Sequence, residues 1–215
     1  MVLIQGDATK YDDVSRAVEG VDAVVNLAHD GGLNATDTYR NLLGSARAVA
    51  EACLVAGTRR LVFVSSLAAL YVGDPNTIID DSTDVDPHAK HRAAYSAAKA
   101  EAERLLLSMH RERSLRVCIL RPGVVVGEGG LPFHSGLGFF NSERHCMGWN
   151  EGKNPLPFVL VTDVAAAIIG SLSAQDVDGR SYNLVGDVNL SAREYIDELA
   201  RVLERPLRFH PPSGH

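Results

Sequence analysis

The sequence predicts an α/β fold built around a doubly wound parallel sheet, and three observations predict it. Short valine-rich runs recur along the chain, segments of helical length separate them, and glycine, proline or aspartate closes most of them. Apolar runs of this kind are typical of strands buried on both faces. Strands that alternate with helices require right-handed crossovers and a parallel sheet covered on both sides. With 215 residues, 46% of them hydrophobic, the chain is long enough for one such core.

The predicted elements of the first part follow one another at regular spacing. Apolar runs bounded by turn formers indicate the strands, and apolar residues at helical period indicate the helices, with Gly20 and Gly57 as stop signals. We expect, in chain order, a strand over 2–5, a helix over 11–20, a strand over 21–28, a helix over 37–56, a strand over 61–65, a polar loop over 73–89, a helix over 93–113 and a strand over 116–120.

The character of the chain changes after this last strand. Residues 127–157 hold seven of the 19 glycines, three of the nine prolines and the single tryptophan, which indicates a loop-rich lid or substrate segment. Residues 158–165 suit a strand followed by a helix, which Asp163 caps and which ends at residue 173. A strand over 181–185 and a helix over 191–203 follow, the latter with Ser191 and Glu194 as a capping box.

Charge and composition exclude several classes of protein. With 21 basic and 27 acidic side chains the formal net charge is −6, so no electrostatic footprint for nucleic acid or an anionic membrane surface is present. The apolar runs fall far short of the roughly 20 residues of a membrane-spanning helix, and the first residues carry no secretion leader. Three cysteines without a Cys-x-x-Cys pair indicate free thiols in a reducing compartment. We therefore expect a cytoplasmic protein without nucleic-acid or membrane partners.

The sequence signals no metal site. The eight histidines are scattered, and none forms a pair at metal-ligand spacing on a helix. Asp80, Asp81, Asp84 and Asp86 cluster in the polar loop, but they lack the glycine and the closing glutamate of a calcium loop. A solvated loop is the simpler interpretation.

The pattern that carries chemistry is Tyr95-Ser96-Ala97-Ala98-Lys99. The spacing of four places the Tyr95 phenol and the Lys99 ammonium on one helix face, one turn apart. A cation about 4 Å from a phenol at an effective dielectric of about 20 contributes up to about 4 kcal/mol, or roughly 3 pKa units, so we expect Tyr95 to exchange a proton near neutral pH. Such a pair is also commonplace on surface helices. Ser65 and Ser66 strengthen the signal, because they stand at the carboxyl end of a strand, where parallel sheets bind ligands.

These residues belong to a wider pattern that resembles the extended short-chain dehydrogenase/reductase superfamily, in its NAD(P)-dependent epimerase/dehydratase and dihydroflavonol-reductase-like group. The resemblance covers nearly the whole chain, and the matching segments occur in the family's order. These segments are Gly6-Asp7-Ala8, residues 20–28, Asn41-Leu42-Leu43-Gly44-Ser45, residues 63–69, Tyr95 with Lys99, and Leu120-Arg121-Pro122-Gly123.

The resemblance implies a role for each matching residue. In the family a tyrosine is the general acid/base on the substrate oxygen, a lysine lowers its pKa and holds the nicotinamide ribose, and a serine or threonine orients the substrate. Carried over, these are Tyr95, Lys99 and Ser66, with Ser65 as the less favoured alternative to Ser66. The resemblance further implies that Asp7 and Ala8 flank the adenine, that Leu27 and Ala28 line the dinucleotide crevice, that Asn41 supports the site and that Pro122 approaches the nicotinamide.

Simpler roles stay open for three of these residues. Asp7 is also suited to capping a turn, Asn41 to satisfying a backbone group, and Pro122 to ending a strand.

The chain departs from the family at its start. Members begin with a strand, a glycine-rich turn that approaches the pyrophosphate and a helix whose N-terminus receives it, followed by a strand whose end selects NAD or NADP. No Gly-x-x-Gly-x-x-Gly or Gly-x-Gly-x-x-Gly follows a strand near the start here. We expect one βαβ unit of on the order of 50 residues to be absent, which leaves NAD and NADP equally open as the cofactor.

Domain organisation and function follow as predictions. Residues 1–126 form a partial, Rossmann-like dinucleotide-binding domain, and residues 127–215 supply a small C-terminal substrate lobe, with some segments returning to the main sheet. The favoured function is hydride transfer between a nicotinamide and a secondary alcohol or ketone of a small molecule, or one half of an epimerisation. The alternatives are a non-catalytic relative that senses a dinucleotide or binds a protein, and an inactive fragment truncated at its N-terminus. Analogy with relatives suggests a homodimer.

Overall fold

The computed structural model describes residues 2–29, 33–70, 78–142 and 144–212, and these residues fold into two compact units. Unit 1 comprises Met1–Pro122 and Ala166–Asn183, and unit 2 comprises Gly123–Ala165 and Leu184–His215. The chain therefore passes from unit 1 to unit 2 and returns to unit 1 before it ends in unit 2. The part of the predicted polar loop over residues 73–77 lies outside the described residues.

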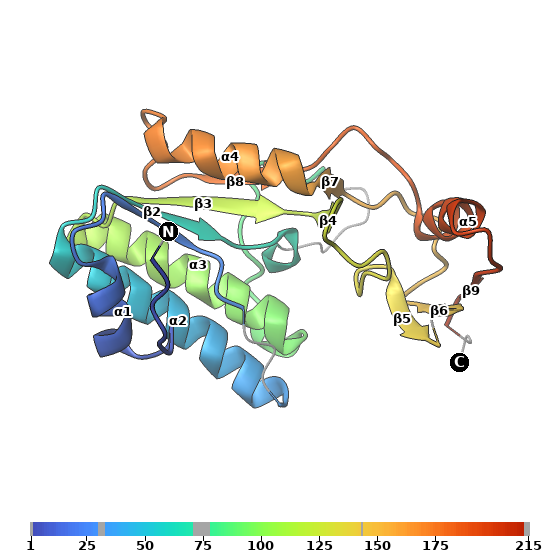
Figure 1. The fold of residues 1–215 in the computed structure, drawn as a ribbon, viewed down its shortest axis with the longest axis horizontal. Helices are drawn as coiled ribbons and strands as arrows, with labels where there is room; N and C mark the ends of the chain where they lie inside the picture. Colours follow the sequence, from blue (N-terminus) through green and yellow to red (C-terminus); the bar gives the residue numbers. More distant parts are fainter. Residues whose placement is uncertain (1, 30–32, 71–77, 143, 213–215) are drawn as a thin grey trace. The chain divides into compact units, whose positions relative to one another are not determined.

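A four-stranded sheet with the order β1-β2-β3-β8 forms the centre of unit 1 (Figure 1). β1 (Ala23–Asn26) pairs in parallel with β2 (Arg60–Val64), and β2 pairs in parallel with β3 (Val117–Pro122). β8 (Ser181–Leu184) returns along the chain to the other side of β3. This sheet and its crossovers confirm the predicted α/β fold with a parallel, Rossmann-like sheet.

Helices cover this sheet on both faces, as the crossovers require (Figure 1). α1 (Tyr11–Val18), α2 (Ala35–Ala56) and α3 (Ala94–Arg113) lie on one face, and the part of α4 (Val161–Ser173) that belongs to unit 1 lies on the other. α2 begins at its N-cap Asn34, whose side chain accepts a hydrogen bond from the Asp37 amide, and it ends at Gly57 in the left-handed region.

The core of unit 1 lies between the sheet and the helix pair α2 and α3. Small alanines on both helices allow close approach, and branched side chains from β2 and β3 fill the space between them. Two short 3₁₀ helices, η1 (Leu67–Ala69) and η2 (Ala89–His91), lie between β2 and α3 in the chain. This packing fixes α3 against the carboxyl end of β2.

The predicted strand over residues 2–5 is wrong. These residues have no regular secondary structure, and the side chains of Val2 and Leu3 are each 85% exposed. A strand requires a hydrogen-bonded neighbour, and within the described residues β1 pairs with β2 alone. Apolar composition favoured a strand, but a segment with no partner cannot satisfy its backbone groups in that conformation.

The start of α4 is also corrected. The helix begins at Val161, so Asp163 lies in its first turn and is not the cap. A carboxylate is favourable in either place, because the N-terminal end of a helix carries a partial positive charge. The acidic residue therefore did mark the start of the helix, although the prediction placed the first helical residue three positions too late.

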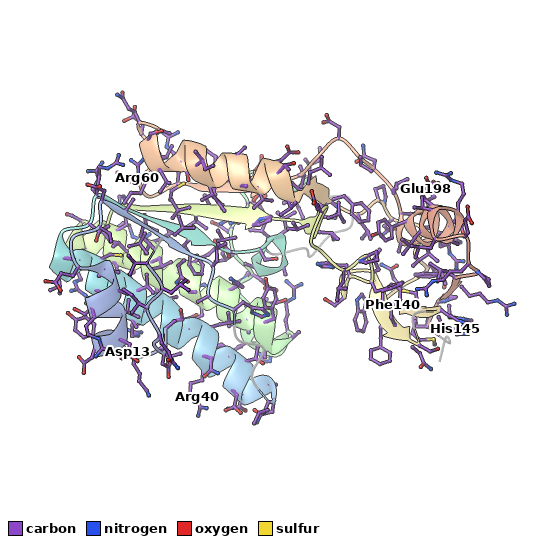
Figure 2. All side chains as sticks on the ribbon, in the orientation of Figure 1. Asp13, Arg40, Arg60, Phe140, His145 and Glu198 are labelled. Carbon is purple, nitrogen blue, oxygen red and sulfur yellow. The ribbon has the colours of Figure 1, made fainter. Side chains whose placement is uncertain are left out.

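Among its described residues, unit 2 contains two small sheets, the helix α5 and the first residues of α4. β5 (Gly138–Asn141) and β6 (His145–Gly148) form an antiparallel hairpin, so the segment predicted as loop-rich contains regular structure. β9 (Arg208–His210) extends this hairpin in parallel with β6. Figure 2 labels Phe140 and His145 on the two strands of the hairpin. The remaining elements of unit 2 are β4 (Val124–Val126), β7 (Phe158–Leu160), which pairs with β4, and α5 (Ala192–Val202).

Close approach to Phe209 explains two glycines of unit 2. A Cβ atom at Gly148 would lie 2.0 Å from Cζ of the Phe209 ring, and one at Gly152 would lie 2.4 Å from the same atom. The Arg193 guanidinium lies 4.9 Å from the centre of that ring. The predicted capping box of α5 is confirmed, because the Ser191 hydroxyl accepts a hydrogen bond from the Glu194 amide and the Glu194 carboxylate accepts one from the Ser191 amide.

Cys53, Cys118 and Cys146 are free and fully buried. Burial raises the pKa of each thiol to about 11. Among the helices of the described residues, none combines the length with the apolar character that a membrane crossing needs.

Candidate active site

One face of α3 meets the carboxyl end of β2 and brings the predicted catalytic residues together. Lys99 Nζ donates a hydrogen bond to the Val64 carbonyl at 2.8 Å. The Tyr95 hydroxyl, one turn earlier on α3, lies close enough to the Ser66 hydroxyl for that hydroxyl to lower its pKa. The Lys99 ammonium lies 5.8 Å from the centre of the Tyr95 ring. Ser66, Tyr95 and Lys99 therefore form one cluster within unit 1.

The two serines at this strand end have different surroundings. Ser65 is buried, and its hydroxyl donates a hydrogen bond of 2.5 Å to Glu103. Ser66 is half-buried, caps η1 by accepting a hydrogen bond from the Ala68 amide, and contacts Tyr95. A substrate oxygen can reach only a hydroxyl that faces the crevice, so this geometry favours Ser66.

Burial dominates the electrostatics of the pair on α3. It raises the pKa of Tyr95 above its ordinary value, and the neighbouring Ser66 hydroxyl opposes this shift. It lowers the pKa of Lys99 to about 8, and the nearby carboxylate of Glu103 opposes that shift. The pKa of Tyr95 thus moves in the opposite direction from the one expected from the spacing of four. The Lys99 ammonium points to the Val64 carbonyl, so its attraction to the phenolate does not outweigh desolvation of the Tyr95 phenol.

A pocket of about 420 Å³ lies beside β1 and contains four of the predicted cofactor residues. It is open to solvent and is lined by residues of α1, β1 and the N-terminal segment, among them Asp7, Ala8, Leu27 and Ala28. The next residue along the chain, His29, packs edge-on against the Tyr95 ring with 5.3 Å between ring centres. The pocket and the catalytic cluster are thus joined through the chain that leaves β1.

Neither Asn26 nor His29 was predicted to be a site residue, although both shape this edge of the sheet. Asn26 is 5% exposed, and its side-chain oxygen accepts a hydrogen bond of 3.0 Å from the Ala28 amide. A buried asparagine at the end of a valine-rich strand is an available signal, because a buried amide needs partners. No pattern in the sequence identifies His29, which meets Tyr95 only in the folded chain.

The other predicted residues are placed as follows. Asp7 accepts hydrogen bonds from the amide and the hydroxyl of Thr9, at 2.9 and 2.7 Å, and these bonds lower its pKa. Asp7 therefore caps a turn at the rim of the pocket. Asn41 is half-buried on α2, and Pro122 is the buried last residue of β3. The roles of Asn41 and Pro122 toward a cofactor stay predictions.

The described residues fit two parts of a dinucleotide and not the third. The partly apolar pocket suits an adenine, and the phenol and ammonium of the catalytic cluster suit ribose hydroxyls. The charged residues that line the pocket are Asp7 and Asp13, and the Asp7 amide already donates to Asp13 Oδ2 at 2.9 Å. Carboxylates repel a pyrophosphate, so the part of the chain described here does not form a phosphate cradle.

A parallel sheet covered by helices, with Ser66 at the carboxyl end of β2 facing Tyr95 and Lys99 of α3, defines the class as a Rossmann-like α/β protein. The sequence model of the "NAD dependent epimerase/dehydratase family" matches residues 2–185, and the chain belongs to that family. No groups of three or more His, Cys, Asp or Glu side chains suited to a metal ion occur in the described ranges.

The curated relatives include proteins that are named as hydroxysteroid dehydrogenases. The chain is 29% identical over 227 residues to 3beta-hydroxysteroid-dehydrogenase/decarboxylase isoform 1 of Arabidopsis thaliana, covering 98% of this chain and 51% of the relative. It is 33% identical over 139 residues to 3 beta-hydroxysteroid dehydrogenase type 7 of Homo sapiens, covering 59% of this chain and 37% of that protein. The chain thus spans about half the length, or less, of these relatives.

Solved structures with the same fold include enzymes named for sugar nucleotides. A dTDP-glucose 4,6-dehydratase of Streptomyces venezuelae, with NAD bound, superposes with a TM-score of 0.79 at 21% identity, covering 95% of this chain and 65% of that chain. The epimerase Mth375 of Methanothermobacter thermautotrophicus gives a TM-score of 0.81 at 16% identity, covering 98% and 66%. At these identities the likeness concerns the fold.

Proposed function

We propose that this protein transfers hydride between a nicotinamide and a secondary alcohol or ketone of a small molecule, with Ser66, Tyr95 and Lys99 as the catalytic residues. The observation that carries the proposal is the cluster itself, in which the Tyr95 side chain contacts Ser66 and lies one helical turn from Lys99. Family membership adds support, because the family is NAD-dependent. Bound NAD or NADP would supply the hydride acceptor or donor.

The chain's own residues would act on the substrate oxygen. Ser66 donates a hydrogen bond that orients the oxygen, and Tyr95 moves the proton between its phenol and that oxygen. Because burial raises the pKa of Tyr95, the phenol holds its proton at neutral pH and is ready to donate it to a ketone. Lys99 stabilises the phenolate that remains, from one turn along α3.

We further propose that residues 127–215 supply the substrate lobe and that residues 1–126 carry the dinucleotide, with Asn41 and Pro122 supporting the site. The relatives' names cover both steroids and sugar nucleotides. They support a small-molecule alcohol or ketone as the substrate class and favour no single member of it. A homodimer and a cytoplasmic location belong to the same proposal.

The test compares Tyr95→Phe with the matched control Tyr11→Phe, which removes a hydroxyl from the exposed start of α1. Calorimetry measures the binding of NADH and NADPH to each purified protein, and a panel of hydroxysteroids and sugar nucleotides measures turnover. We expect Tyr95→Phe to lower turnover by about 100-fold or more, as loss of a general acid does, with cofactor affinity unchanged. Tyr11→Phe should match the wild type.

The same experiment distinguishes the proposed function from its alternatives. Dinucleotide binding without turnover of any compound in the wild type would favour the non-catalytic, sensing relative. Wild-type turnover by Tyr95→Phe would overturn the assignment of Tyr95. Failure to bind either dinucleotide would favour the inactive fragment, in accord with the carboxylates that line the pocket.

A further inference from the structure

A buried ion pair lies behind the catalytic cluster. Glu103 is 0% exposed and Arg121 is 4% exposed. Arg121 donates to Glu103 Oε2 from Nη2 at 2.8 Å and from Nε at 3.0 Å, and its Nη1 donates to the Thr83 carbonyl at 3.2 Å. Taking two charges out of water costs free energy that the attraction between them often fails to return. Stability alone is therefore a weak explanation for this pair.

Glu103 extends the contact between α3 and the strand end that carries Ser66. Its Oε1 accepts the short hydrogen bond from Ser65, while Lys99 holds the carbonyl of Val64. Tyr95, Lys99 and Glu103 follow one another at intervals of four, so they share one face of the helix. Val64 and Ser65 are thereby hydrogen-bonded to two successive turns of α3, and the next residue, Ser66, lies beside Tyr95 on the turn before.

Lys99 lies in largely apolar surroundings, so the nearby negative charge of Glu103 affects its protonation. From β2, the Phe63 ring lies 5.0 Å from the ammonium, and from α3 the Tyr95 ring lies 5.8 Å away. Glu103 is the carboxylate of α3 that faces Lys99, with Arg121 of β3 bonded to it. His29, after β1, contacts Tyr95. Burial lowers the pKa of Lys99 to about 8, and Glu103 opposes this shift.

We propose that Glu103 is a positioning residue of the active site, which keeps the Lys99 ammonium protonated and, through Ser65, fixes the strand end that presents Ser66 to Tyr95. Arg121 holds the Glu103 carboxylate in place from the neighbouring strand β3. This inference rests on the proposed function, since Lys99 and Ser66 matter here as catalytic residues.

The first test titrates Lys99 without cofactor or substrate. The chain has four lysines, so ¹⁵N-lysine labelling gives few Nζ signals, and Lys99→Met identifies the one from Lys99. In Glu103→Gln we expect the titration midpoint of Lys99 to fall by about one pH unit, because an opposing charge has been removed. The matched control is Glu101→Gln, an identical change on the same helix at a carboxylate that is 46% exposed, which should leave the midpoint unchanged.

An unchanged Lys99 midpoint in a folded Glu103→Gln protein would overturn the inference. Where Glu103→Gln does not fold, Glu103→Asp replaces it. That variant keeps the charge but withdraws it by one methylene, so the midpoint should fall by a smaller amount, and no fall would count equally against the inference. Thermal unfolding of each variant separates a local change at Lys99 from general loss of structure.

The second test concerns the strand end and uses Ser65→Ala. With ¹³C-tyrosine labelling of the six tyrosines, the Cζ signal of Tyr95 reports the surroundings of its hydroxyl, which include Ser66. We expect this signal to move in Ser65→Ala while the Tyr11 signal stays in place; an unmoved Tyr95 signal would contradict the coupling. Both tests are read on the ligand-free protein, so they can fail while Tyr95→Phe still supports the proposed function, and the reverse also holds.

Discussion

At the scale of single residues, burial separates side chains that the sequence presents as equivalent. Ser65 and Ser66 are adjacent hydroxyls, yet one is bonded to a buried carboxylate and the other contacts the phenol of the site. Likewise Lys99 is 5% exposed, whereas Lys90 is exposed to solvent. Chemistry at this site therefore depends on which groups lose their water, and that information lies in the packing of α3 against β2.

Lys99 gives a pH-dependent prediction for stability. Its pKa is about 8 in the folded protein against an ordinary value of 10.5, so the unfolded state binds more protons between these values. The free energy of unfolding of the wild type should therefore rise as the pH rises from about 8 to 10.5. Below pH 8 the ammonium is charged in both states, so the full cost of burying it destabilises the folded protein. Lys99→Met removes this cost, so its stability relative to the wild type should fall by about 3 kcal/mol across the window.

Urea unfolding at several pH values between 7 and 10.5 measures this difference. Lys90→Met is the matched control, because it makes the same substitution at a lysine that the folded protein leaves exposed. A constant difference between Lys99→Met and the wild type across the window would show that Lys99 titrates normally in the folded protein.

At the scale of elements, a buried arginine secures the C-terminal end of α4. Figure 2 labels Arg60 at the start of β2. Its Nη1 donates to the carbonyls of Ser171 and Ala174, at 2.8 and 2.7 Å, and its Nε donates to Asp178 at 2.7 Å. The last carbonyls of a helix have no partner within the helix, so Arg60 satisfies groups that would otherwise be left unpaired.

Arg60→Met should destabilise the protein by about 2 to 4 kcal/mol, because it leaves buried carbonyls and one side of Asp178 without a donor. Arg116→Met is the matched control. Arg116 bonds to the same Asp178 but its side chain is 52% exposed, so its loss should cost about 1 kcal/mol or less. Chemical denaturation of both variants tests the difference, and equal costs would contradict a special role for Arg60.

Elements whose sequence pattern is local were predicted correctly, and elements that depend on a distant neighbour were not. Strands β1, β2 and β3 and helices α1, α2 and α3 were predicted, because their hydrophobic period and caps are local. The strand over residues 2–5 was not correctly predicted, since pairing is a property of a neighbour and not of the segment. The hairpin of β5 and β6 was hidden among glycines, of which Gly138 and Gly148 serve close approach and were mistaken for loop signals.

The candidate site follows the same division. The Tyr95 and Lys99 spacing and the place of Ser66 were visible in the sequence, and the fold brings all three together. The direction of the Tyr95 pKa shift was not, because desolvation depends on everything that packs around the phenol. Glu103 and Arg121 come together only through the packing of α3 on β3.

At the scale of the whole molecule, the division into two compact units predicts two separable stabilities. Gly148 and the Phe209 ring belong to unit 2, and a Cβ atom at Gly148 has no room. Gly148→Ala should therefore destabilise unit 2 by about 1 to 3 kcal/mol and leave unit 1 unchanged. Hydrogen exchange read by mass spectrometry should show faster exchange only in peptides of unit 2.

Gly170→Ala is the control for this prediction, because nothing lies within 4 Å of the Cβ position at Gly170. Alanine also has the higher helix propensity, so this variant should be neutral or slightly more stable. Faster exchange across both units in Gly148→Ala would mean that they unfold as one.

The three buried thiols allow local unfolding of the protein to be measured by alkylation. At pH 8 a thiol whose pKa is about 11 is ionised in roughly one molecule in a thousand, and only the thiolate attacks an alkylating reagent. Iodoacetamide should therefore label each cysteine only when its surroundings unfold. Cys53 and Cys118 belong to unit 1, and Cys146 belongs to unit 2. The order in which the three cysteines are alkylated as the urea concentration rises therefore shows which unit unfolds first.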